Sequence, residues 1–190
     1  MSWVIEVSFD EPAERLVRRA WAALDEAGVR SLAGMPVGAY RPHVTLLGFD
    51  DADITAVRGA SRPVLTEALG LSLPLTSVGF FPTDEAVAFL GVTPSRQLPD
   101  LHQDLYAAVT PLLTGVAAYY EPGSLVPHCT LAVGVCDSAT VLAAVSSVLP
   151  IAARLAGAWL VQYPTGDPRV ELGWCGGWGQ PVGGGRGVPA

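Results

Sequence analysis

The string Pro-His-x-Thr-Leu occurs twice in this chain, as PHVTL at residues 42–46 and as PHCTL at residues 127–131. The sequence has only three histidines, so two of them stand in matched contexts. Side chains alternate between the two faces of a β-strand, so a histidine and a threonine two positions apart project from the same face. Two such strands beside one cleft would present two imidazoles and two hydroxyls to one ligand. The residues singled out are His43, Thr45, His128 and Thr130.

The flanks of the two strings repeat a common order of elements. A typical helix N-cap follows each motif histidine by 10 positions, Asp53 after His43 and Ser138 after His128 (53 − 43 and 138 − 128). An expected helix start precedes each histidine by 32 positions (43 − 11 and 128 − 96). Each half therefore runs helix, motif strand, helix, strand. The repeat indicates an internal duplication with pseudo-two-fold symmetry.

The remaining elements follow from periodicity and capping signals. Apolar alternation predicts strands over residues 3–9, 43–48, 71–81, 85–92, 127–135, 158–163 and 169–174. Capping patterns predict helices that begin near residues 10, 53, 95 and 138, the first followed by Gly28 as a C-cap and the second broken near Pro63. We expect a loop over residues 34–38, one two-lobed domain over residues 1–175, and a flexible Gly-rich tail over residues 176–190.

The composition excludes several classes of protein. A net charge of −7 argues against wrapping a long polyanion, although a small nucleotide or an RNA end stays compatible. All 11 basic residues are arginine, and the absence of lysine excludes a P-loop lysine, a Schiff base and a lysyl-nucleotidyl intermediate. No apolar run approaches the roughly 20 residues of a membrane span, and the N-terminus lacks the order of a signal peptide. We expect a soluble cytoplasmic monomer.

The three cysteines show no CxxC spacing, so the sequence gives little support to a metal or redox framework. Cys129 lies between His128 and Thr130 in the second string. Alternation along a strand would turn it to the opposite face, so we expect it in the core.

Two PHxTL strands in a duplicated α/β chain of this size resemble the two-histidine (2H) phosphoesterase superfamily. That superfamily includes the LigT-like 2′-5′ RNA ligases and the cyclic nucleotide phosphodiesterases. The resemblance implies an α+β, LigT-like fold with two pseudo-symmetric lobes, each an antiparallel sheet with outer helices, around a central groove that holds the four motif residues. It also implies action on 2′,3′-cyclic phosphates or related 2′-5′ and 3′-5′ linkages of nucleotides or RNA ends, without metal, ATP or another cofactor.

The motif residues suit that chemistry. Opening a cyclic phosphate needs a base to deprotonate water and an acid to protonate the leaving ribose oxygen. A histidine pKa of about 6.5 makes both forms available near neutral pH. Thr45 and Thr130 can donate hydrogen bonds to the non-bridging phosphate oxygens. The family resemblance favours His128 as the base and His43 as the acid.

Further candidates for substrate binding are less specific. RNA-handling relatives often carry an arginine shortly before the second motif, but residues 121–126 read EPGSLV here. Arg41 is the nearby cation in sequence, beside the first motif. Aromatic residues could stack on a base, with Phe49 at the expected lip of the groove. The candidates besides Phe49 are Tyr163, Tyr40, Phe81 and Trp174.

Several alternatives stay open at this point. His102 lacks a threonine partner and is interpreted as a helix-surface residue. A two-histidine metal site is possible, but no carboxylate or third histidine recurs beside the motifs. The chain could be a non-catalytic module that binds nucleotides or RNA ends, or a repurposed member that acts in a specialised biosynthetic step. Acidic charge and the missing arginine favour small nucleotides over RNA, and the sequence does not distinguish hydrolysis from ligation.

Overall fold

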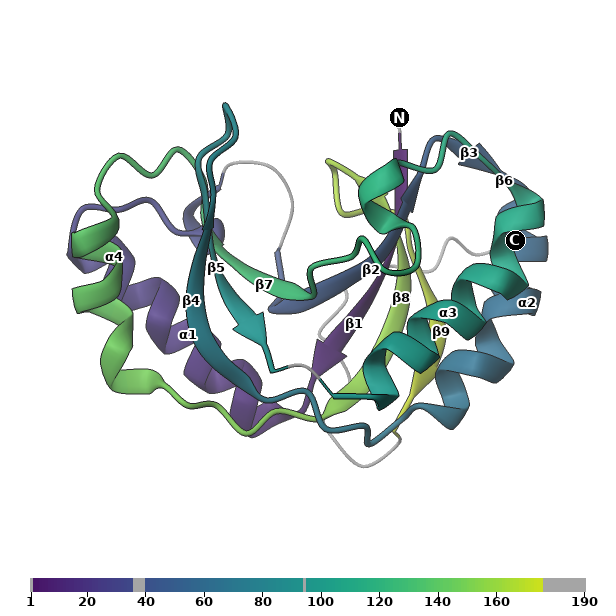
Figure 1. Cartoon of the computed structure of the whole chain (residues 1–190), viewed down its shortest axis with the longest axis horizontal. Coiled ribbons are helices and arrows are strands. Elements are labelled where there is room, and N and C mark those ends of the chain that lie inside the picture. The colour runs from purple at the N-terminus through teal and green to yellow at the C-terminus, as the bar shows by residue number, and fades with distance from the viewer. Residues whose placement is uncertain (1, 36–39, 94, 176–190) are drawn as a thin grey trace, which may run out of the picture.

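The computed structural model describes residues 2–35, 40–93 and 95–175, which form two antiparallel β-sheets with helices outside them (Figure 1). The larger sheet has the strand order β2-β1-β8-β9, and the smaller has the order β4-β5-β7. A two-residue pair, β3 with β6, lies apart from both sheets. The strands are β1 (Ser2–Phe9), β2 (His43–Phe49), β3 (Asp51–Ala52), β4 (Leu75–Phe81), β5 (Val87–Val92), β6 (Leu113–Thr114), β7 (His128–Ala132), β8 (Leu155–Tyr163) and β9 (Arg169–Trp174).

The helices cover only the outer face of each sheet (Figure 1). Helices α1 (Glu11–Glu26) and α4 (Ser138–Val145) cover the smaller sheet, and α2 (Ile54–Glu67) and α3 (Gln97–Val109) cover the larger one. The chain therefore crosses between the lobes, because α1 follows β1 in sequence yet packs on the opposite sheet. Short 3-10 turns are η1 (Leu32–Gly34), η2 (Thr110–Leu112), η3 (Ala118–Tyr120) and η4 (Ser146–Val148). The expected α+β fold with two antiparallel sheets and outer helices is confirmed.

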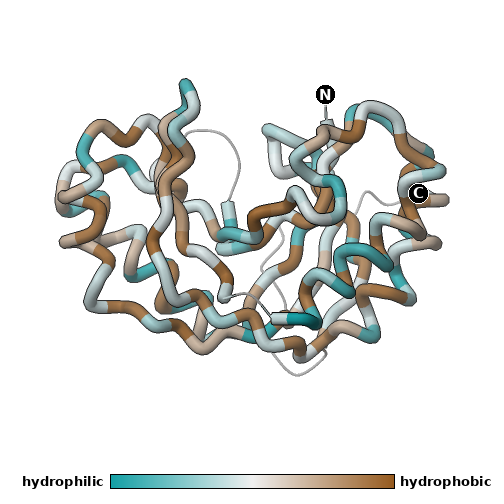
Figure 2. The backbone as a smooth tube through the Cα atoms, in the orientation of Figure 1, coloured by the Kyte–Doolittle hydropathy of each residue, from teal (hydrophilic) through white to brown (hydrophobic). Residues whose placement is uncertain are grey.

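One apolar core runs through both lobes, between the sheets and their helices. Helix α1 shows why it packs there, because its buried residues recur at helical spacing. They are Ala13, Val17, Ala20, Trp21 and Leu24. Figure 2 shows hydrophobic residues along the strands of both sheets and mixed hydropathy along the helices. Each large apolar side chain that is fully buried contributes roughly 1.5–3 kcal/mol to folding.

The two motif strands lie side by side where the sheets meet. Both β2 and β7 are edge strands of their sheets. Strands β2 and β7 are in contact, and the backbone of His43 lies near the thiol of Cys129, which places the start of β2 against β7. We call the sheet faces not covered by helices the inner side. The inner faces of the two lobes therefore adjoin at the motif strands.

Some element boundaries differ from those that the sequence predicts. Helix α2 continues through Pro63 instead of breaking there. Proline leaves the carbonyl of Gly59 without its helical partner, but both residues are exposed, so that carbonyl can bond to water. Buried residues on both sides of Pro63 hold the helix in place. Helix α3 ends at Val109 because Pro111 cannot continue it. The N-cap of α4 is Asp137 rather than Ser138, since its carboxylate accepts the backbone N–H of Ala139 at 2.9 Å.

Other boundaries shift by a few residues. Strand β4 begins at Leu75 rather than at residue 71, and β7 ends at Ala132, before Gly134 with φ +70. Gly28 follows α1 with φ +80, the left-handed conformation expected after a helix end. Turn η1 occupies the start of the expected loop at residues 34–38, whose last three residues, like the Gly-rich segment 176–190, lie outside the described residues. In the described part of the chain, no helix is long and apolar enough to span a membrane.

Candidate active site

The four motif side chains face the inner side of the two sheets. Strands β2 and β7 begin with the same burial pattern, in which the first and third residues are partly accessible and the second and fourth are buried. The accessible positions are His43, Thr45, His128 and Thr130. Cys129 is 1 % exposed, so its expected place in the core is confirmed. Burial raises the pKa of the Cys129 thiol to about 12, which keeps it in the neutral form.

Both imidazole rings are held in the same way by the chain just before them. Nδ1 of His43 lies 2.7 Å from the carbonyl oxygen of Arg41, and Nδ1 of His128 lies 2.7 Å from that of Val126. A carbonyl can only accept, so Nδ1 carries the hydrogen and donates it in both rings. Nε2 is then the atom that remains for chemistry.

The repeated proline of the motif explains this shared geometry. In each case the accepting carbonyl belongs to the residue before the proline, at position i−2 from the histidine. Proline fixes its own φ and pushes the preceding residue into an extended conformation. The local string thus supplies a contact that helps to orient each imidazole.

Tertiary contacts hold the second motif strand in place. The indole N–H of Trp21 in α1 donates to the carbonyl oxygen of Thr130 at 3.2 Å. Ser31 forms a β-bridge with Ala132 at the end of the same strand. A helix that belongs in sequence to the first half therefore supports the second motif.

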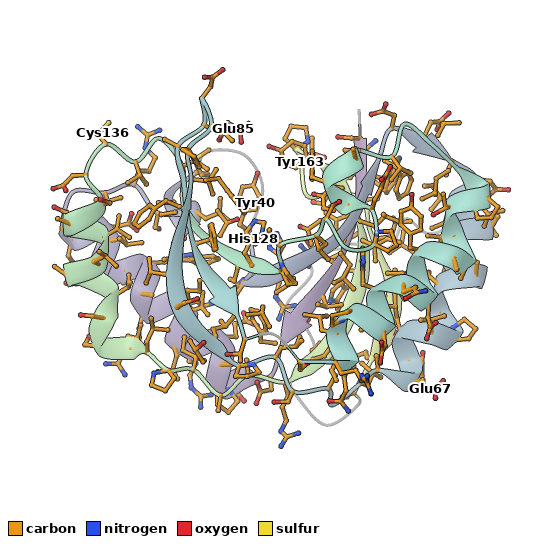
Figure 3. All side chains as sticks on the ribbon, viewed as in Figure 1. Tyr40, Glu67, Glu85, His128, Cys136 and Tyr163 are labelled. Atoms are coloured by element: carbon orange, nitrogen blue, oxygen red, sulfur yellow. The ribbon has the colours of Figure 1, made fainter. Side chains whose placement is uncertain are left out.

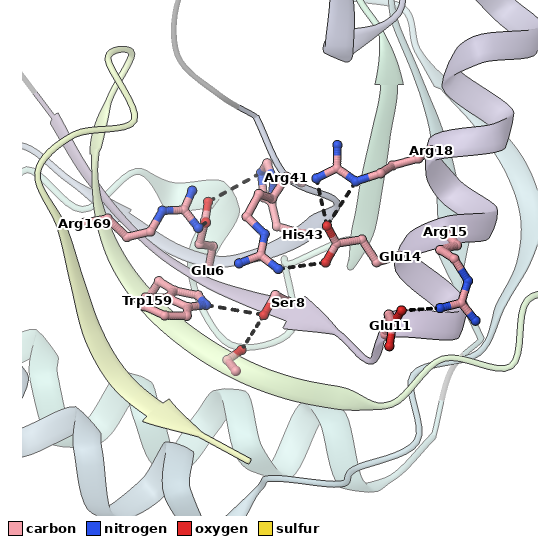
Figure 4. Close-up of polar contacts among 11 residues, drawn as sticks. Glu6, Ser8, Glu11, Glu14, Arg15, Arg18, Arg41, His43, Trp159 and Arg169 are labelled. Carbon is pink, nitrogen blue, oxygen red and sulfur yellow. Dashed lines mark hydrogen bonds and ion pairs between the residues drawn. The ribbon is translucent and has the colours of Figure 1, made fainter. Parts of the chain in front are cut away.

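The first histidine lies in a charged environment (Figure 4). Its Nε2 lies 3.8 Å from Oε2 of Glu6, and Oε1 of Glu6 lies 3.0 Å from Nη1 of Arg169. The guanidinium of Arg169 in turn lies 5.7 Å from the ring centroid of Trp159. Trp159 is fixed by its own N–H, which donates to Ser8 at 3.3 Å. Strands β1, β8 and β9 thus build the surroundings of a histidine on β2.

The second histidine lies in an aromatic environment instead. Its ring meets Phe81 edge-on with centroids 4.9 Å apart, and Phe89 lies at 5.1 Å. Phe81 and Phe89 stack on each other at 4.4 Å. Gly79, opposite Phe89 in β4, leaves room for that ring, because a Cβ there would overlap it. Burial lowers the pKa of His128, the charge of His43 adds to the lowering, and the hydrogen bond to Val126 opposes it.

Arg41 lies close to the first motif, and its side chain is engaged. Nη2 of Arg41 donates to Glu14 in α1 at 2.8 Å, and its side chain is 17 % exposed. Burial opposes ionisation of Glu14, but Arg41 and Arg18 outweigh it and hold the pKa of that carboxyl below its usual value. Nη1 of Arg41 is buried and has no hydrogen-bond partner among the described residues.

Phe49 does not lie at the lip of the inner side, so that expectation is wrong. Its side chain is 2 % exposed. The pairing of β2 with β1 skips Leu46, which forms a β-bulge. An extra residue inverts the alternation beyond it, so Phe49 points to the core instead of the side that carries His43 and Thr45.

The other aromatic candidates divide into two groups. Tyr163 is 50 % exposed at the end of β8. Figure 3 shows Tyr163, Tyr40 and His128 on the inner side between the lobes. Burial raises the pKa of Tyr40, with smaller contributions from Tyr163 and Glu6, which places these groups near one another. Trp174 instead packs against Trp159 with centroids 5.9 Å apart.

His102 is buried rather than on the helix surface, which corrects our interpretation. It is 3 % exposed, beneath the first motif strand, near the backbone of Leu46 and of Tyr120. Burial lowers the pKa of His102, and those two backbone groups oppose the lowering. Its position fits support of the bulge in β2 rather than contact with a ligand.

Sequence reasoning missed Glu6, Arg169 and Phe89. Glu6 alternates with apolar residues in β1 and therefore resembles a residue on a solvated face. Its burial comes from the strands on both sides of β1, which no local pattern reveals. Arg169 is 126 positions from His43 (169 − 43) and reaches the site only through the closing β8–β9 hairpin.

The described residues contain no group of three or more histidine, cysteine, aspartate or glutamate side chains that could hold a metal ion. The carboxylate nearest to a motif histidine, Glu6, is paired with Arg169. The side chains around the two motifs carry imidazole, hydroxyl and guanidinium groups.

The fold has two sheets with outer helices, and each sheet contributes one edge strand with a His-x-Thr motif. These features define a class of protein with a duplicated two-histidine site. The family model of the 2′-5′ RNA ligase superfamily matches residues 9–167, which include both motifs. The chain therefore belongs to this superfamily, and the resemblance drawn from the motifs is confirmed.

Solved structures and curated proteins add little to this assignment. The chain is similar to Usb1 of Kluyveromyces marxianus, with 12 % identity and a TM-score of 0.49 over 90 % of this chain and 97 % of that one. The structure of the same protein with uridine monophosphate gives 14 % identity and a TM-score of 0.48 over the same shares. No curated protein matches the chain.

Proposed function

We propose that the protein is a phosphodiesterase that opens 2′,3′-cyclic phosphates or related 2′-5′ linkages of nucleotides or RNA ends, with His43 and His128 as its acid–base pair. Membership of the 2′-5′ RNA ligase superfamily supports a phosphoesterase in general. The observation that carries the proposal is the matched orientation of the two rings. Each Nδ1 is bound to a backbone carbonyl at 2.7 Å, which leaves both Nε2 atoms to a substrate.

We propose the following proton transfers, in which the family resemblance assigns the base to His128 and the acid to His43. Nε2 of neutral His128 takes a proton from water while the water oxygen attacks phosphorus. The bond from phosphorus to one ribose oxygen breaks, and that oxygen takes the proton from Nε2 of protonated His43. The products are a phosphomonoester, a free hydroxyl, protonated His128 and neutral His43. Exchange with solvent restores the starting charges.

The threonines have a separate role in this proposal. Thr45 and Thr130 lie two residues beyond the histidines, on the same face. Their hydroxyls can donate to the non-bridging oxygens, where negative charge is concentrated during the reaction. Duplicated threonines would hold the phosphate between the two imidazoles, as in-line displacement requires.

The substrate class is narrowed by the charges near the site. Arg41 and Arg169 are the cations near His43, and each is paired with a carboxylate. The net charge of −7 disfavours a long polyanion. Small cyclic nucleotides are therefore our first choice, with Tyr163 as a partly exposed aromatic ring that could stack on a base.

A panel of substrates tests the proposal directly. We would measure turnover of 2′,3′-cyclic mononucleotides and of 2′-5′ and 3′-5′ dinucleotides in the presence and absence of EDTA. We expect hydrolysis that is unchanged by EDTA. Loss with EDTA and recovery with added Mn²⁺ or Zn²⁺ would indicate a metal-dependent enzyme, and binding without turnover would indicate a nucleotide-binding module.

A further inference from the structure

Glu6 is the one carboxylate among the described residues that is buried, with 4 % exposure. Its pairing explains where it points. Glu6 is in register with Thr45 of β2 on one side and with Trp159 of β8 on the other. Directly paired residues of neighbouring strands share a face, so Glu6 faces the inner side together with Thr45. Burying a carboxylate is costly, so its retention at such a position calls for a role.

The two oxygens of Glu6 point to two different cations. Oε1 lies 3.0 Å from Nη1 of Arg169, and neither atom has another partner among the described residues. Oε2 lies 3.8 Å from Nε2 of His43. That distance is an ion-pair distance but too long for a hydrogen bond. A proton on Nε2 therefore feels the negative charge and is still free to move to a substrate.

Nothing comparable accompanies the second histidine. His128 contacts the rings of Phe81 and Phe89 and the carbonyl of Val126. In the part of the chain that the structure describes, no ion pair involves it. Apolar rings do not stabilise an imidazolium as a carboxylate does, and burial lowers the pKa of His128. The neutral form is favoured on this side of the site.

From this geometry we infer that the buried Glu6–Arg169 pair is a positioning pair that makes His43 the proton donor of the reaction and leaves His128 as the proton acceptor. The inference rests on the proposed function. It gives a structural reason for the acid and base roles, which the two matching motifs do not distinguish. Glu6 attracts the imidazolium of His43, and the ion pair with Arg169 fixes the Glu6 carboxylate in place. Neither residue needs to touch the substrate.

Other titratable groups near His43 come from several elements, and they do not cancel the attraction between Glu6 and the His43 imidazolium. Arg41 on its own segment is neutralised by Glu14 from α1. From β7, His128 carries no charge in its neutral form. Tyr40 is neutral near pH 7, and burial raises the pKa of its hydroxyl further. Among the described residues, Glu6 is therefore the charged group that lies at ion-pair distance from His43.

The test compares Glu6→Gln with wild type and with Glu67→Gln, a matched control at an exposed position of the outer helix α2. We would measure pH–rate profiles on the best cyclic nucleotide and on an analogue with a very good leaving group. On the nucleotide, the alkaline limb of the Glu6→Gln profile should move to lower pH by roughly one unit, and the acidic limb should stay. On the analogue, which needs no acid, rates should equal those of wild type.

Equal losses on both substrates, or an unmoved alkaline limb, would overturn the inference. If Glu6→Gln does not fold because Arg169 is left unpaired, the double variant Glu6→Gln/Arg169→Gln removes both charges and should show a shift in the same direction. Histidine NMR at pH 6.5 separates this inference from the proposed function. A lower fraction of protonated His43 in Glu6→Gln supports the pair even if every tested substrate is inert, and an unchanged fraction refutes it.

Discussion

The surroundings of His43 and of His128 differ far more than the sequences around them. Both rings begin an edge strand, and both donate Nδ1–H to the carbonyl two residues earlier. Beyond that shared geometry, His43 faces the carboxylate of Glu6, whereas His128 lies against two phenylalanine rings. Local sequence sets how each ring is held, and distant strands set what each ring faces. A duplicated motif can therefore supply two groups of the same type with opposite roles.

The largest expected effect comes from removing either histidine. We expect His43→Ala and His128→Ala each to lower kcat by roughly 10² to 10⁴, because each removes one of two proton transfers. Steady-state turnover on the best substrate measures this, with thermal unfolding to show that each variant is folded. If both variants keep near-wild-type turnover, the two motifs do not form an acid–base pair.

The second prediction separates the two histidines. A substrate with a very good leaving group needs no acid, so His43→Ala should recover much of its rate on it. His128→Ala should not recover, since water still needs a base. The ratio of rates on good and poor leaving groups measures the difference. The opposite pattern of recovery would exchange the two roles, and recovery of neither would mean that both histidines act mainly in positioning.

The sequence predicts those parts of the site that depend only on neighbouring residues in the chain. Alternation placed His43, Thr45, His128 and Thr130 on one face of each strand, and Cys129 in the core. The sequence does not reveal the bulge at Leu46, because the bulge depends on pairing with β1, and it turns Phe49 toward the core.

Burial of isolated polar residues was equally hidden. His102 and Glu6 occur at positions that resemble exposed faces of a helix and a strand, and both are covered by elements distant in sequence. Charge partners that span most of the chain, such as Glu6 and Arg169, can be found only once the order of strands is known.

We expect a smaller loss of turnover from substituting the motif threonines, which occur in both halves. Thr45→Val and Thr130→Val keep the shape and remove one hydroxyl. A hydrogen bond to a charged group contributes about 1.5 kcal/mol or more, so each variant should lose about 10-fold or more in turnover. Thr55→Val, at an exposed position of the outer helix α2, is the control and should leave turnover unchanged. Unchanged kinetics in both motif variants would leave the threonines as ordinary strand residues.

The smallest expected effect is on the pH dependence of the free energy of unfolding, and it should differ between the histidine beneath β2 and the histidine on β7. Burial lowers the pKa of His102 beneath β2 and that of His128 on β7. Below about pH 6.5 these histidines bind protons more readily in the unfolded chain than in the folded chain. The free energy of unfolding should therefore be highest above that pH and fall as the pH is lowered.

We expect His102→Gln to flatten this dependence more than His128→Gln, because His102 is almost fully buried at 3 % exposure. Thermal unfolding between pH 8 and pH 5 measures the slope for each variant, which is independent of any constant loss of stability from the substitution itself. Equal slopes for His102→Gln and wild type would mean that His102 can take up its proton without unfolding, and that β2 does not depend on the neutral form of this histidine.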